Sequence, residues 1–131
     1  MIDDIIDAVV TAFAGEAVDS AIRKRRERKA REAGRVRGAV RALNGEAHGI
    51  SSRWEVIEFE PGPQVLIWGR VRLDVASVHR RTERTKLSEQ PPLGSDAVIL
   101  VLSTPTGVVE CAVPREDAQP VAARLGFPVD S

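Results

Sequence analysis

The chain has 131 residues, of which 43% are hydrophobic and 29% charged, with 19 basic and 19 acidic side chains. This length and composition predict one globular unit and exclude wholesale disorder. A single cysteine excludes an internal disulfide, and one thiol with two histidines excludes a Cys/His zinc site, so neither a metal nor a cofactor is expected. Apolar runs stay below the roughly 18 residues that span a bilayer, and no secretory signal pattern is present. We therefore expect a cytoplasmic protein.

The neutral total conceals an uneven distribution of charge along the chain. Residues 1–22 hold five acids and no base, whereas residues 23–41 hold ten bases and only two acids. The remaining ninety residues are mildly acidic. An asymmetry of this kind bears on partners and solubility rather than on the fold.

The N-terminal third carries a helical pattern. From Ile2 onward apolar residues recur at spacings of three and four, which predicts one long helix, or two with a break near Gly15, over about residues 2–33 and ending at Gly34. The apolar stripe must be buried on the protein's own core or on a second copy, and both are favoured over membrane insertion because the polar face is acidic. We expect a homo-oligomer, most simply a dimer, whose interface residues are Ile2, Ile6, Val9, Val10 and Phe13.

The second half of this expected helix is charged nearly all round. Its candidate anion-binding side chains are Arg23, Lys24, Arg25, Arg26, Arg28, Lys29 and Arg31. A run of charge is more often a solvated helix face than a binding site. A peripheral binder of anionic membranes or nucleic acid, acting through Arg23–Arg41, is therefore kept as an alternative function, with a membrane-peripheral location as its consequence.

From residue 35 the helical period gives way to short apolar runs separated by turns. Strands are expected at Val36–Leu43, Trp54–Phe59, Gln64–Trp68, Val71–Val75, Ala97–Ser103 and Val108–Val113, and residues 79–96 are expected to form a loop with at most one short strand. A short helix is expected from Pro114 to about Leu125, with Gly126 ending it.

Strands that follow one another without intervening helices indicate an antiparallel sheet. The predicted fold class is therefore α+β. A long N-terminal helical segment (1–34) precedes a small antiparallel sheet or partly open barrel closed by a C-terminal helix (35–131). This is the architecture of pleckstrin-homology-like (PH-like) domains.

Several stretches of the second part also carry a family resemblance. They are Arg53–Val56, Val65–Trp68, Leu73–Val78, Val98–Leu102, Gly107–Val113 and the helix Pro114–Leu125. Over about residues 52–126 the chain resembles an actinobacterial family of uncharacterised small proteins with a PH-like domain. Members of that family usually begin with a membrane-spanning helix. The acids at positions 3, 4, 7, 16 and 19 depart from that pattern, so the anchor is not matched in this chain.

Residues that could carry chemistry are few and scattered. Cys111 lies within an expected buried strand, His48 and His79 are expected on the surface, and Glu58 and Glu60 would share a solvated strand face. Because no catalytic motif is present, an enzyme is not expected and no catalytic residue is assigned. The favoured function is a non-catalytic protein-interaction or scaffold module. A small-molecule carrier is disfavoured because the short strands leave little interior volume.

Overall fold

The computed structural model describes residues 19–43, 49–81, 90–93 and 96–127. The described chain begins with the N-terminal helix, residues 19–32. Its strands are β1 (Val36–Ala42), β2 (Glu55–Gly62), β3 (Val65–Trp68), β4 (Val71–Asp74), β5 (Ser77–Arg80), β6 (Val98–Thr104) and β7 (Gly107–Val113). A 3₁₀ turn, η2 (Arg115–Asp117), leads into the helix α2 (Ala118–Leu125).

The strands form a single antiparallel sheet in the order β4-β3-β2-β1-β7-β6-β5. The two edge strands, β4 and β5, are joined by only Val75 and Ala76, so the sheet has to curl until its edges approach each other. The Val75 N–H donates to the Gln64 carbonyl at 2.9 Å, and the Ala76 N–H donates to the Ser103 carbonyl at 2.7 Å. The connection is thereby tied to both halves of the sheet.

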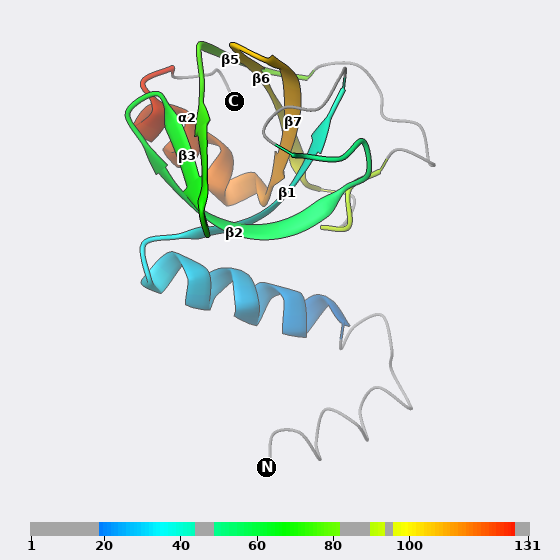
Figure 1. Ribbon diagram of the computed structural model, residues 1–131. Coiled ribbons are helices and arrows are strands. Elements are labelled where there is room, and N and C mark those ends of the chain that lie inside the picture. The colour runs from blue at the N-terminus through cyan, green and yellow to red at the C-terminus, as the bar shows by residue number, and fades with distance from the viewer. Residues whose placement is uncertain (1–18, 44–48, 82–89, 94–95, 128–131) are drawn as a thin grey trace.

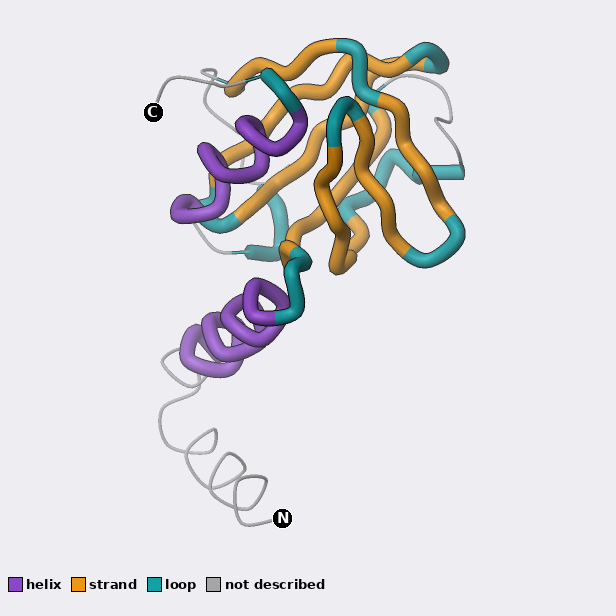
Figure 2. The backbone as a smooth tube through the Cα atoms, turned by 90° about the vertical axis from the view of Figure 1, so that its left-hand side faces the viewer, coloured by secondary structure: helices purple, strands orange, loops and turns teal. Residues whose placement is uncertain are grey.

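Two helices flank this curled sheet. Figure 1 shows α2 on its concave side and the N-terminal helix outside it, beneath β2. Figure 2 shows from another direction that the N-terminal helix lies outside the curled sheet and joins it through a short turn. The fold is therefore α+β, with a half-barrel sheet and a helix at either end.

The main core fills the concave side of the sheet. In β7, for example, Val109, Cys111 and Val113 face this core, while Glu110 and Ala112 alternate onto the convex face. The largest fully buried apolar side chains of the core are Phe59, Leu66, Leu73, Leu100, Leu102 and Leu125. Because α2 supplies its apolar stripe to this core, it closes the open side of the half-barrel.

A smaller apolar cluster lies on the convex face. Ala39, Ile99 and Ala112 come from neighbouring strands, and Leu93 covers them. The neighbouring Gly38 of β1 faces the main core instead, where a Cβ would lie 2.6 Å from the carbonyl oxygen of Ala112 and 3.0 Å from Phe59 Cε1. Only glycine fits between β1 and β7 at this point.

Both helices end where the sequence predicts, and for the same reason. Gly34 and Gly126 adopt positive φ angles of 77° and 90°, which glycine reaches without steric cost. Beyond Gly34, the Arg35 N–H reaches back to the Ala30 carbonyl at 2.8 Å. This closes the helix with a Schellman motif.

Most of the expected elements are confirmed, with two differences in the sheet. The helix expected over about residues 2–33 is confirmed for residues 19–32, and residues 2–18 lie outside the described residues. Strand β5 was missed in part, because Val78 is its only apolar residue and no alternation is visible. Strand β2 continues through Pro61, which was expected to end it, because Pro61 still pairs with Leu66 of β3.

Candidate functional site

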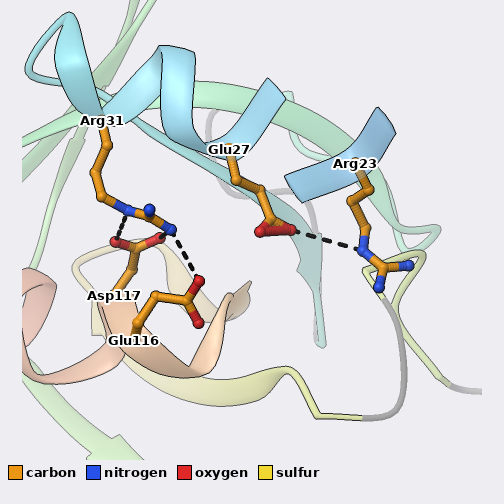
Figure 3. A network of polar contacts seen from close by, with 5 residues as sticks. All are labelled: Arg23, Glu27, Arg31, Glu116 and Asp117. Carbon is orange, nitrogen blue, oxygen red and sulfur yellow. Dashed lines mark hydrogen bonds and ion pairs between the residues drawn. The ribbon is translucent and has the colours of Figure 1, made fainter. Parts of the chain in front are cut away.

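The N-terminal helix is fastened to the rest of the fold by Arg31. Its Nε donates to Asp117 Oδ1 at 2.7 Å and its Nη2 donates to Asp117 Oδ2 at 3.1 Å (Figure 3). The same Nη2 also reaches Glu116 Oε1 at 3.1 Å. Since Asp117 is buried at the start of α2, this fork joins the helix to the closing helix. The hydrogen bond that Arg31 donates to the Asp117 carboxylate raises the pKa of the Arg31 guanidinium, which therefore stays charged.

A second carboxylate, Glu27, faces inward one turn earlier. It is buried, and its nearest partner is Arg23, whose Nε lies 3.7 Å from Glu27 Oε1. Burial, followed by the charge of Glu116, raises the pKa of Glu27. Among residues 19–32 only Glu27 and Ala30 are buried. The helix is thus held mainly by charged groups rather than by an apolar stripe.

The basic side chains proposed for anion binding fall into two groups. Arg31 is engaged by Asp117 and Glu116, and Arg23 lies near Glu27. The other five are exposed, namely Lys24, Arg25, Arg26, Arg28 and Lys29. Some of them line a shallow groove of about 420 Å³, which includes Lys24, Arg25 and Arg28 together with Asp96 and Glu116. Their role in anion binding stays a prediction.

A second groove, of about 360 Å³, runs between the N-terminal helix and the convex face of β1 and β2. Three guanidinium groups line it, from Arg23 and Arg26 on the helix and Arg37 on β1. Its other lining residues are Asp19, Ile22, Val56, Pro92 and Leu93. We call this the arginine groove. The sequence analysis included Arg37 only as part of the basic segment Arg23–Arg41 and did not assign Val56 to a site, because the packing of the helix against β1 and β2 is a tertiary contact.

A buried carboxylate that the sequence analysis missed lies on the convex face of β7. Glu110 is 1% exposed and accepts bonds from Arg41 Nε at 2.7 Å and Arg81 Nη1 at 2.8 Å. The Arg41 guanidinium also lies over the Trp54 ring, 4.7 Å from its centroid. Glu110 is the only charged residue of its strand, and this isolated charge was the sequence signal that could have identified it as a buried carboxylate. These contacts link β1 and β7 to Arg81, the residue that follows β5, so the cluster has a structural role.

Those residues considered for catalysis that the structure describes do not form a reactive cluster. Cys111 is buried in the core, and burial raises its pKa to about 12, so the thiolate is inaccessible at neutral pH. His79, Glu58 and Glu60 are exposed, as expected, and His48 lies outside the described residues. Within the described ranges, no group of three or more His, Cys, Asp or Glu side chains is arranged to hold a metal ion.

The expected oligomer interface lies outside the described residues, as it comprises Ile2, Ile6, Val9, Val10 and Phe13. Among the helices of the described chain, none combines the length and the apolar character needed to cross a membrane. Comparison of the chain with protein-family models, curated proteins and solved structures finds no match.

Proposed function

We propose that this chain is a non-catalytic interaction module built on a PH-like domain. The observation that carries the proposal is the filled interior of the half-barrel, where Phe59, Leu66 and Leu100 are fully buried and α2 covers the open side. A filled interior leaves the outer surface, where the grooves lie, as the place for binding. Of the groups considered for chemistry, Cys111 is buried in the core, and Glu58 and Glu60 are exposed on a strand face, while Glu110 is buried in ion pairs.

The strand order supports the PH-like assignment. A sheet in the order β4-β3-β2-β1-β7-β6-β5, curled so that its edges approach and closed by a C-terminal helix, is compatible with that fold. We also propose, from the sequence resemblance over residues 52–126, that the chain belongs to the actinobacterial family of small PH-like proteins. A cytoplasmic location is part of the same proposal and rests on the sequence features given above.

The partner that we propose is a second copy of the chain. The concave side of the sheet is already covered by α2, so it offers no place for the apolar stripe of residues 2–13. Burying each large apolar side chain of that stripe contributes roughly 1.5–3 kcal/mol, which favours association over exposure to water. A homo-oligomer, most simply a dimer, buries the stripe.

Light scattering on the full chain at tens of micromolar tests this proposal. We expect a dimer mass for the natural sequence and a monomer mass for the double variant Val9→Asp with Phe13→Asp. The variant Thr11→Asp with Gly15→Asp is the control, because it adds the same two charges on the opposite side of the expected helix. A monomeric natural chain contradicts the proposal, and so does a dimer that the first variant leaves intact.

A second candidate function, binding to anionic membranes or nucleic acid, is supported by the exposed basic side chains Lys24, Arg28 and Lys29. Binding of this kind releases counterions and weakens steeply with salt. Co-sedimentation with phosphatidylserine vesicles and a DNA mobility-shift assay, each at low and physiological salt, tests it. Absence of binding to both at low salt ends this alternative.

A further inference from the structure

The arginine groove combines positive charge with an apolar lining, and both features are typical of a binding surface. Leu93 is almost fully buried at the groove, whereas Val56 is 38% exposed although it lies on a strand. Ile22 and Pro92 line the groove beside Val56 and are not buried either, so the three guanidinium groups adjoin an apolar patch rather than one isolated apolar side chain.

Two of the three guanidinium groups have no ion-pair partner among the residues that the structure describes. Arg23 approaches Glu27 at 3.7 Å, but Arg26 and Arg37 form no ion pair there. Asp19 lines the same groove, and Glu58 is the cross-strand neighbour of Arg37, yet neither makes an ion pair with Arg26 or Arg37. The groove therefore retains positive charge at Arg26 and Arg37.

The N-terminal segment of the same sequence has the complementary composition. Residues 2–10 contain five large apolar residues and three carboxylates, at Asp3, Asp4 and Asp7, and no base. Apolar side chains of this segment can cover Val56, while its carboxylates meet Arg26 and Arg37. Residues 2–10 therefore match the arginine groove both in charge and in apolar character.

We propose that the arginine groove of one copy binds residues 2–10 of a second copy. A second copy, rather than the same chain, is the proposed donor because the homo-oligomer proposed above requires a contact between copies, and the mixing of two variants described below distinguishes the two cases. With two-fold symmetry each copy donates its segment and receives the other. This inference rests on the proposed homo-oligomeric function and names the surface that receives the stripe.

Charge reversal on each side of the contact tests the inference in the full chain. The groove variant Arg26→Glu with Arg37→Glu and the segment variant Asp3→Lys with Asp7→Lys are each expected to weaken dimerisation at least 100-fold by light scattering. The control is Arg70→Glu with Arg72→Glu, which reverses two exposed charges near β4 and should leave the dimer intact. Circular dichroism checks that every variant folds.

Mixing the two weakened variants gives the decisive result. In a mixed dimer the natural segment of the groove variant meets the natural groove of the segment variant, and the two reversed surfaces also meet. We therefore expect an equimolar mixture to regain the dimer mass. Failure of the mixture to associate overturns the inference, as does an unweakened groove variant.

The failures of the two proposals are distinguishable. If Val9→Asp with Phe13→Asp dissociates the protein while the groove variant does not, the homo-oligomer stands and the groove is not its receiving surface. A monomeric natural chain refutes both proposals.

Discussion

Replacing Glu110 by glutamine removes the charge that Arg41 and Arg81 share, while keeping the size of the side chain. The carboxylate is 2% exposed, and its contacts with the two guanidinium groups are as short as 2.6 Å and 2.8 Å. The glutamine amide offers one acceptor oxygen and one donor nitrogen. One of the two guanidinium groups would therefore face an N–H donor in place of a carboxylate oxygen. Breaking a buried pair from one side costs about 3–5 kcal/mol, because the remaining charge stays buried without compensation.

Thermal and urea unfolding followed by tryptophan fluorescence measures this cost. For a chain of this length, about 4 °C of melting temperature corresponds to each kcal/mol, so we expect a fall of about 12–20 °C. Glu58→Gln is the matched control, since Glu58 is exposed on β2, and it should change stability by less than about 0.5 kcal/mol. A loss below about 1 kcal/mol for Glu110→Gln would refute the view that this carboxylate braces the convex face.

Four further outcomes follow from the structure. Asp117→Asn should loosen the fork to Arg31 and speed amide hydrogen exchange in residues 19–32 about tenfold, with little change in the strands; uniform exchange rates across the protein would contradict this. The folded-state pKa of Glu27 is raised, so its burial costs stability as pH rises above the ordinary value of 4.5; Glu27→Gln should therefore raise the unfolding midpoint at pH 7 and have no effect below pH 4. Cys111 should resist Ellman's reagent at pH 8 until the protein is unfolded, since burial raises its pKa to about 12; reaction of the folded protein would show that the thiol is accessible. Gly38→Ala should destabilise the fold by about 2 kcal/mol or more in urea unfolding, because the new Cβ meets a carbonyl oxygen of β7; a neutral effect would show that β1 can shift.

The sheet was largely predictable from the sequence because alternation is local information. The hairpin of β6 and β7, the closing helix and the glycine at each helix end all follow from neighbouring residues, such as the four-residue turn from Thr104 to Gly107. Strand β5 lacks this signal, since only Val78 is apolar among its four residues. Its pairing with β6 is a tertiary contact that the sequence pattern does not show.

The charged contacts were not predictable for a different reason. Arg31 and Asp117 are 86 positions apart, and nothing in either local sequence pairs them. Arg31 therefore looked like one more member of a solvated basic run. Glu110 was more accessible to prediction, because a lone charge in an otherwise apolar strand demands a buried partner. The identity of that partner depends on the register, which places Arg41 directly opposite.

Carbodiimide cross-linking of mixed isotopic copies is the most direct test of association through the N-terminal segment. Unlabelled and nitrogen-15-labelled chains are refolded together, and zero-length bonds between carboxylates and lysine amines are mapped by mass spectrometry. The variant Arg26→Lys keeps the charge and places an amine in the arginine groove, and this amine should couple to Asp3 or Asp7. We predict mixed-isotope cross-links at the statistical proportion, because the two residues belong to different copies. Cross-links found only between residues of the same isotope would contradict association through this segment.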